Sequence, residues 1–251
     1  MQRIGLIGYG KAGQAVASVL ANTPSLSLAW IVKRQPVGER PAPAPIRVAL
    51  SAADFAALLD SHPVDAIIDF SGPETICHYG AEAARRGISI ISANSNHNAE
   101  QLALARTLGA QTRIMCCPNI TLGINFLLIA AKALQKMAPQ VDVAIVEEHF
   151  RGKPEISGTA MRLADALGVP AQEITSLRLG GVIGHHEVVF GFPYQTVRLT
   201  HDSISREAFG TGAVFALSLL AKEATGYHQM EQLMLKHMLT ELEQQAQPGA
   251  A

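Results

Sequence analysis

The sequence predicts an α/β protein of two parts, one with a parallel sheet and a second, α+β part with a mixed or antiparallel sheet. Three observations predict this class. In the first third of the chain, strand-like apolar runs alternate with helical patterns, as in βαβ units. A glycine-rich turn separates the first such strand from the first helix. From about residue 140, four strand-like runs follow one another with one helix among them, which favours an antiparallel or mixed sheet.

The first part is expected to hold buried strands joined by helices. The expected strands are RIGLIG (3–8), LSLAWIV (26–32), VDAIIDF (64–70), ISIIS (88–92) and TRIMCC (112–117). The expected helices are KAGQAVASVLAN (11–22), PETICHYGAEAARRG (73–87) and the apolar, largely buried PNITLGINFLLIAAKALQKM (118–137). The proline-rich RPAPAP (40–45) is interpreted as a loop within this part and not as a linker between domains.

The second part is expected to be rich in strands. They are VDVAIVEE (141–148), ITSLRLGGVIG (174–184), HHEVVFGF (185–192) and QTVRLTHDS (195–203), with the helix MRLADALG (161–168) after the first. Helical patterns return over 210–226 and 230–245, and the QPGAA tail is expected to fray. We therefore expect one domain over residues 1–120 and 210–251 and a second domain over 121–209.

The composition excludes several classes of function. The chain has 251 residues, 48% of them hydrophobic, and a net charge of −1, so it lacks the basic excess of a nucleic-acid-binding protein. Its N-terminal apolar run is too short for a signal peptide, and no stretch reaches the length that spans a bilayer, so a cytoplasmic protein is expected. The three cysteines, Cys77, Cys116 and Cys117, are expected to be reduced packing residues, and no metal site is expected.

The glycine-rich turn predicts a dinucleotide site. Gly8, Tyr9, Gly10, Lys11, Ala12 and Gly13 follow a predicted strand and open a predicted helix. The glycines permit a tight turn and let a pyrophosphate approach backbone N–H groups at the helix N-terminus. A purely structural turn is the alternative. The sequence therefore predicts a Rossmann-like fold for this domain.

The next strand indicates which dinucleotide binds. Where an Asp or Glu would hold the ribose hydroxyls of NAD, the chain has Lys33 and Arg34. Two cations suit a 2′-phosphate, so NADPH is expected and NADH is the alternative cofactor. The two residues could also be solvated loop charges.

Two later strand ends are expected to border the nicotinamide. Asp69, Phe70 and Ser71 end one strand, Ser92 and Asn94 follow the next, and each segment is expected to lead into a helix. Ligands of open parallel sheets lie outside the carboxyl ends of the strands, which places both segments at the nucleotide. A turn or capping role for Asp69 is an equal alternative.

The charged stretch EEHFRGKPEISGTA (147–160) leads into a predicted helix. Ser157 is the expected N-cap, and the helix is expected to run to Leu167, where Gly168 and Pro170 provide stop signals. Position 160 is Ala and not the Glu or Gln of a capping box, so the first-turn N–H groups are expected to stay free to hold a carboxylate. An ordinary cap without a ligand is the alternative.

An ordered series of residues runs through the chain: Asp69-Phe70-Ser71, Pro118-Asn119, Gly123 with Asn125, Glu148-His149, Lys153, Ser157-Gly158-Thr159-Ala160, Arg178-Gly180-Gly184-His186, and His201-Ser205-Arg206-Phe209-Gly212-Ala213. In this series the chain resembles the dihydrodipicolinate reductase family of lysine biosynthesis, and the resemblance runs over almost the whole length. The resemblance implies a Rossmann-like domain, a substrate-binding and oligomerisation domain over 121–209 whose mixed sheet builds a homotetramer, and hydride transfer from a nicotinamide to a cyclic unsaturated dicarboxylate. A dimer is the alternative assembly.

The resemblance also implies roles for single residues. His149 and Lys153 would be the acid–base pair, and Ser157, Gly158 and Thr159 would hold a substrate carboxylate. Asn94 would touch nucleotide and substrate, and Asn119 would belong to the nucleotide site. The residue types agree with the chemistry, because hydride addition to a conjugated C=N or C=C bond must be completed by a proton. A loop lysine and a capping histidine without catalytic roles are the alternative.

This chain departs from the family pattern around the substrate. Phe150 replaces the second histidine of the family's H-H-x-x-K-x-D-A-P-S-G-T signature, and one residue is missing between Lys153 and Ser157. The family's G-T-T-G loop reads Ser-Ala-Asn-Ser over 92–95, and the nucleotide loop is one residue shorter than usual. Because Phe150 puts an apolar ring where a polar contact is usual, the substrate is expected to differ from the usual dicarboxylate or to lack one of its polar groups.

The remaining charged residues receive no catalytic role. Glu147 and Glu148 could pair with Arg151 or hold the histidine, or they could simply end a strand at the surface. His185 and His186 are expected to pack in a sheet or interface, and a metal site is the alternative. An arginine, Arg178 or Arg206, could hold a carboxylate or form an ion pair. Two other functions stay open: an amino-acid or imino-acid dehydrogenase of the same fold, and a catalytically inactive nucleotide-binding regulatory protein.

Overall fold

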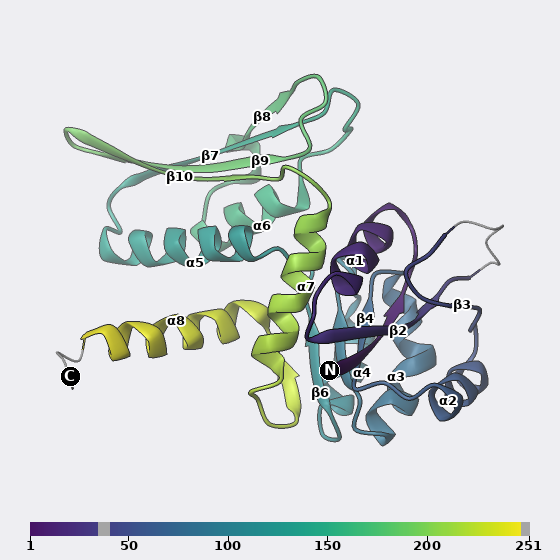
Figure 1. The fold of residues 1–251 in the computed structure, drawn as a ribbon. Helices are drawn as coiled ribbons and strands as arrows, with labels where there is room; N and C mark the ends of the chain where they lie inside the picture. The colour runs from purple at the N-terminus through teal and green to yellow at the C-terminus, as the bar shows by residue number, and fades with distance from the viewer. Residues whose placement is uncertain (35–40, 247–251) are drawn as a thin grey trace. The chain divides into compact units, whose positions relative to one another are not determined.

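The computed structural model describes residues 1–34 and 41–246 (Figure 1). Arg40 of the proline-rich segment and the QPGAA tail lie outside the described residues. The chain divides into two units, residues 1–121 with 209–251 and residues 122–208, and each is described by itself.

The first unit is built on a parallel sheet of seven strands in the order β11-β6-β5-β4-β1-β2-β3. The strands are β1 (Gln2–Ile7), β2 (Leu26–Val32), β3 (Ile46–Arg47), β4 (Ala66–Asp69), β5 (Ser89–Ser92), β6 (Arg113–Cys116) and β11 (Gly226–His228). The strand order reverses between β1 and β4, and the carboxyl ends of strands at such a point are where open α/β sheets bind ligands.

Helices cover both faces of this sheet. They are α1 (Lys11–Ala21), α2 (Ala52–Ser61), α3 (Ile76–Arg85) after the short turn η1 (Pro73–Thr75) and α4 (Ala99–Leu108). The helices α7 (Glu207–Leu220) and α8 (Met230–Ala246) complete the unit, and α8 extends away from the sheet (Figure 1). Right-handed crossovers put α1 on one face and α2, α3 and α4 on the other, because the chain moves along the sheet in opposite directions from β1 and from β3 (Figure 1). These observations confirm the predicted Rossmann-like class.

The core of the first unit is closed around Trp30. Its indole is fully buried and donates to the carbonyl of His62 at 3.0 Å. A side chain at Gly5 on the neighbouring strand would place its Cβ 2.1 Å from the indole, so only glycine admits the ring there. Ile67, Phe55, Tyr79 and their neighbours complete the cluster.

The second unit is a four-stranded mixed sheet in the order β10-β9-β7-β8. The strands are β7 (Asp142–His149), β8 (Thr175–Arg178), β9 (His185–Phe192) and β10 (Gln195–Asp202); β7 and β8 are parallel, and the other pairs are antiparallel. The helices α5 (Leu122–Met137) and α6 (Gly158–Leu167) share an apolar core with one face of the sheet, and η2 (Ala171–Glu173) precedes β8. The predicted mixed sheet is therefore present.

Some predicted bounds were wrong. The strand expected over 174–184 ends at Arg178, because Gly180 adopts a positive φ of 41° and the chain turns there. The helix expected from residue 118 begins at Leu122, and it buries one face only, through residues such as Ile124 and Leu128. The helix α7 begins at Glu207, before the predicted residue 210.

One helix, α2, was not foreseen, although the sequence carries its start signal. The helix α4, which was expected after the segment 92–95, is present. Ser51 and Asp54 form a capping box for α2, and Asn98 and Gln101 form one for α4. The short edge strands β3 and β11 were also missed. Among the described residues, no helix has the length and apolar character needed to cross a membrane.

Candidate active site

The glycine turn after β1 combines a tight bend with open space. Gly8 has a φ of 95°, and a Cβ there would lie 2.6 Å from the Phe70 backbone. A Cβ on Gly13 would lie 2.1 Å from the Gly8 carbonyl oxygen. Among the described atoms, nothing lies within 4 Å of a Cβ built on Gly10, the N-cap of α1. Two glycines thus serve packing, and the third leaves room in front of the helix N-terminus.

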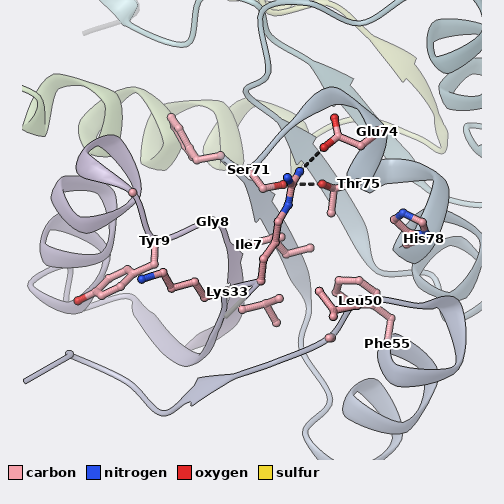
Figure 2. A pocket seen from close by; sticks show the side chains of 15 residues that line it. Ile7, Gly8, Tyr9, Lys33, Leu50, Phe55, Ser71, Glu74, Thr75 and His78 are labelled. Atoms are coloured by element: carbon pink, nitrogen blue, oxygen red, sulfur yellow. Dashed lines mark hydrogen bonds and ion pairs between the residues drawn. The ribbon is translucent and has the colours of Figure 1, made fainter. Parts of the chain in front are cut away.

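A cavity of about 590 Å³ opens at the carboxyl ends of β1, β2 and β4 (Figure 2). Its lining is apolar beneath and charged at the rim. The lining residues are Ile7, Gly8, Tyr9, Gly10, Val32, Lys33, Arg34, Ala49, Leu50, Phe55, Phe70, Ser71, Glu74, Thr75 and His78. Seven residues predicted for the cofactor lie here, and seven do not line it: Lys11, Ala12, Gly13, Asp69, Ser92, Asn94 and Asn119.

The donor set of this cavity fits a phosphorylated dinucleotide. The helix N-terminus carries no side-chain cap among the described residues, and no acidic residue lies in its first turn, Lys11–Gln14, so anions are favoured there. Lys33 and Arg34 stand at the end of β2 (Figure 2). Sequence reasoning missed Glu74, which forms an ion pair with Arg34 inside the cavity, and also Thr75 and His78.

Asp69 lies fully buried beneath the cavity floor. Its carboxylate accepts hydrogen bonds from the Ser71 N–H at 2.8 Å, the Ser71 hydroxyl at 2.5 Å and the Tyr79 hydroxyl at 3.1 Å. Burial raises the pKa of Asp69 to about 6, because the loss of water outweighs these hydrogen bonds. The contacts with Ser71 are typical of a residue that stabilises a turn, which was the alternative role of Asp69 in the sequence analysis.

The turn after β5 is held by its own side chains. Asn94 is buried and donates to the Ser92 hydroxyl at 3.0 Å, and the imidazole of His97 lies 3.1 Å from the same oxygen. His97 was missed by the sequence reasoning. In the segment before α5, the Asn119 side-chain oxygen accepts from the N–H and hydroxyl of Thr121.

In the second unit, one face of the sheet changes abruptly from apolar to polar. Ile145, Val188 and Leu199 lie side by side across β7, β9 and β10. Two residues further along these strands, the register brings Glu147, His186 and His201 together, with Ser176 next to Glu147 on β8. Residues from four different strands thus form one polar row.

Glu147 is the centre of this row. A surface position was one of the roles that the sequence left open, and it is wrong: the side chain has no exposed surface. Its Oε1 accepts from the Ser176 hydroxyl at 2.7 Å and pairs with the Arg178 guanidinium at 2.8 Å, while its Oε2 pairs with His149 Nδ1. Burial raises the pKa of Glu147, but the hydrogen bonds from Arg178, Ser176 and His149 outweigh burial and lower it.

His186 joins the row to the start of α6. Its Nε2 lies 2.8 Å from the Ser157 hydroxyl oxygen, and its ring meets that of His149 edge to face at 5.3 Å between centroids. Burial and the neighbouring histidines lower the pKa of His186 to about 3, so the ring is neutral near pH 7. Its Nδ1 has no hydrogen-bond partner among the described residues.

Ser157 caps α6 as expected, but the first turn is not entirely free. The Ser157 hydroxyl accepts the Ala160 N–H at 3.0 Å, so the prediction that this donor stays free was wrong. In a capping box the serine accepts the N–H of the third helical residue, while the Glu or Gln at that position accepts the N–H of the N-cap residue. An alanine at position 160 therefore does not free its own N–H from Ser157. Gly158, at the first position of α6, is exposed.

Lys153 lies on a loop that Arg178 fixes from β8. The guanidinium donates to the carbonyls of Lys153 and Glu155 at 3.0 and 2.9 Å. Burial is the main cause that lowers the pKa of His149, and the positive charge of Lys153 lowers it further. The Lys153 charge therefore acts on the His149 imidazole. Phe150, on the same loop, is 46% exposed.

Arg178 therefore forms the ion pair that was one of its two predicted roles. Arg206 is exposed. His185 pairs with Asp202 at 2.7 Å. The described residues contain no group of three or more His, Cys, Asp or Glu placed to bind a metal.

Comparisons with known proteins agree with this geometry. Residues 2–120 match the family model described as dihydrodipicolinate reductase, N-terminus, and residues 121–234 match that of its C-terminus. A 4-hydroxy-tetrahydrodipicolinate reductase of Nitratidesulfovibrio vulgaris is 31% identical over 86% of this chain and 92% of its own. One of Laribacter hongkongensis is 30% identical over 90% of this chain and 96% of its own. The dipicolinate-bound dihydrodipicolinate reductase of Paenisporosarcina sp. TG-14 superposes with a TM-score of 0.78 at 22% identity, covering 92% of this chain and 99% of that one, and shows the same fold.

Proposed function

The chain belongs to the dihydrodipicolinate reductase family, and we propose that it uses NADPH to reduce a small cyclic imine or enamine carboxylate in lysine biosynthesis. NADPH binding is supported by the open space at Gly10, in front of the uncapped N-terminus of α1. Lys33 and Arg34 line the same cavity. The helix N-terminus would hold the pyrophosphate, and the two cations would hold the 2′-phosphate. NADH is the alternative cofactor.

The nucleotide supplies a hydride when it is bound, and the protein must supply the proton. Hydride addition to the carbon of a C=N bond moves the electron pair to nitrogen, which then takes a proton. His149 and Lys153 are the proposed donors, because a histidine exchanges protons near neutral pH and the positive charge of Lys153 acts on its imidazole.

The start of α6 is the proposed seat of a substrate carboxylate. The Ser157 hydroxyl, the exposed Gly158 and Thr159 lie in the first turn of a helix, where partial positive charge favours an anion. The bound dipicolinate of the Paenisporosarcina enzyme is a cyclic dicarboxylate, which supports this class of substrate. The proposed roles of Asp69, Ser92, Asn94 and Asn119 at the nicotinamide remain predictions.

We propose that Phe150 sets this enzyme apart within its family. A half-exposed phenyl ring offers no hydrogen bond, so a substrate group that the family holds with a histidine would be unpaired here. The enzyme is therefore expected to tolerate a cyclic imine that lacks one polar group of the usual dicarboxylate. Turnover of the complete dicarboxylate with the affinity of a typical family member would contradict this proposal.

The activity is tested by following NADPH oxidation by the purified protein. The assay compares 4-hydroxy-tetrahydrodipicolinate with a six-membered cyclic imine that carries one carboxylate, each with NADPH and with NADH. Turnover that requires the imine supports the reductase. Amino-acid-dependent reduction of NADP⁺ would instead favour an amino-acid dehydrogenase, and NADPH binding without any turnover would favour a regulatory protein.

We further propose that the protein is a cytoplasmic homotetramer, with a dimer as the alternative. The family resemblance supports this assembly, and light scattering of the purified chain measures it directly.

A further inference from the structure

The buried carboxylate of Glu147 has no role in the acid–base pair, although the sheet places it against one member of that pair. It is fully buried on the polar face of β7, two residues before His149. Burying a carboxylate costs several kcal/mol unless partners compensate. Here three partners converge on it, from β8 and from β7 itself, so the arrangement is built and not accidental.

The two oxygens of Glu147 have separate tasks. Oε1 receives the hydroxyl of Ser176 and the guanidinium of Arg178. These two donors fix the carboxylate in place and compensate its charge. Oε2 contacts the Nδ1 atom of His149 and has no other partner among the described residues.

This contact decides where His149 carries its proton. An ionised carboxylate can only accept hydrogen bonds. The hydrogen bonds to Glu147 lower its pKa and so favour the ionised form. Nδ1 must therefore be the N–H of the neutral imidazole, which leaves Nε2 as the atom that gains and loses a proton.

The surroundings leave room at Nε2. A Cβ built on Gly184 would lie 3.1 Å from this atom, so the absence of a side chain at position 184 keeps that side of the ring clear. Lys153 and Arg178 place positive charge near the His149 ring. His186, on β9, also lies near the ring and is neutral near pH 7. Both cations disfavour an imidazolium, and Glu147 is the group that opposes them.

We infer that Glu147 is a positioning residue that holds His149 in the tautomer with its proton on Nδ1 and presents Nε2 for proton transfer to the substrate. The inference rests on the proposed reductase function for its catalytic meaning, but the tautomer itself does not depend on that function. Glu147 acts through His149 and does not touch the reacting atoms in this scheme.

The direct test is the tautomer of His149 in the unaltered protein. Nitrogen NMR of isotope-labelled histidine distinguishes the two neutral tautomers, and the His149→Gln variant identifies the signal. The expected result is a neutral ring protonated on Nδ1. A neutral ring protonated on Nε2 would overturn the inference, whether or not the protein turns over the expected substrate.

The second test uses Glu147→Gln with Glu148→Gln as the matched control. Both changes remove one carboxylate from β7, but strand alternation points the side chain of Glu148 to the opposite face. Glu147→Gln is expected to lower kcat by roughly 10- to 1000-fold, in the range of a general acid–base contribution. It should also lower the apparent pKa of His149 in the pH–rate profile and leave the KM for NADPH unchanged.

The outcomes separate the two proposals. An unchanged pH profile and an unchanged tautomer in a folded Glu147→Gln protein would make Glu147 merely structural. A wild-type protein with the predicted tautomer and no reductase activity would contradict the proposed function and leave the positioning role in place. Equal losses in Glu147→Gln and Glu148→Gln would also refute a specific role for Glu147.

Discussion

The Gly10→Ala substitution separates nucleotide binding from folding. Because no described atom lies within 4 Å of a Cβ at this position, the methyl group meets open space in the free protein. Glycine is a better N-cap than alanine, so the variant should lose about 1 kcal/mol of stability. For a chain of this size, that loss lowers the Tm by about 2–4 °C.

The effect on the cofactor should be larger than the effect on stability. If the pyrophosphate occupies the space in front of Gly10, the methyl group overpacks the complex at a cost of about 2 kcal/mol. That cost corresponds to a roughly 30-fold higher Kd for NADPH. Isothermal titration gives the Kd, and thermal unfolding without nucleotide gives the Tm.

Gly13→Ala is the contrasting variant. Its Cβ would lie 2.1 Å from the Gly8 carbonyl oxygen, and this contact is with backbone and cannot be relieved by a rotamer change. The expected loss is about 1–3 kcal/mol or more of stability, already in the protein without nucleotide. An unchanged Kd for NADPH in Gly10→Ala would refute the proposed pyrophosphate seat, whatever the Tm values.

The remaining predictions concern cofactor choice, pH and catalysis. Arg34→Ala should weaken NADPH binding roughly tenfold and hardly change NADH binding, because only NADPH carries the 2′-phosphate. Glu74→Gln should strengthen NADPH binding a few-fold, since it frees Arg34 from its ion pair and removes a carboxylate from the cavity. The pKa of His186 is lowered to about 3 in the folded protein. Its contribution to the free energy of unfolding is therefore complete above the ordinary pKa of about 6.5 and declines as the pH falls from 6.5 towards 3. His186→Gln should remove this decline, which urea unfolding at several pH values measures. Lys153→Ala should lower kcat by about 100-fold with an unchanged Kd for NADPH. Phe150→His should improve kcat/KM for the complete dicarboxylate more than for the imine with one carboxylate.

Each of these predictions can fail clearly. Equal losses of NADPH and NADH binding in Arg34→Ala would leave the 2′-phosphate without its proposed partner. A stability slope that persists in His186→Gln would assign the acid sensitivity to another group. Full activity of Lys153→Ala would remove this residue from the proton-transfer scheme, and an unchanged substrate preference in Phe150→His would show that position 150 does not select the substrate.

Local sequence signals predicted the elements that depend on near neighbours. The glycine turn, the cap of α6 at Ser157 and its end at Gly168 were all predicted from residues a few positions apart, and the structure has them. The capping boxes of α2 and α4 were equally readable and were overlooked. Elements of this kind are decided by backbone conformation and by hydrogen bonds within one turn.

The sequence by itself therefore determined the fold class, the glycine cradle and the family pattern around His149 and Lys153. Only the tertiary structure decided that Glu147 is buried, because its burial depends on Ser176 and Arg178, which come from a strand some 30 residues later. It also decided that Glu74 would meet Arg34 in the cavity, 40 residues away in the chain. Strand alternation determines which residues of one strand share a face of the sheet, but it does not predict which other strand will lie alongside. The neighbouring strands supply the partners of the buried groups, and these partners set their charge and the positions of their protons.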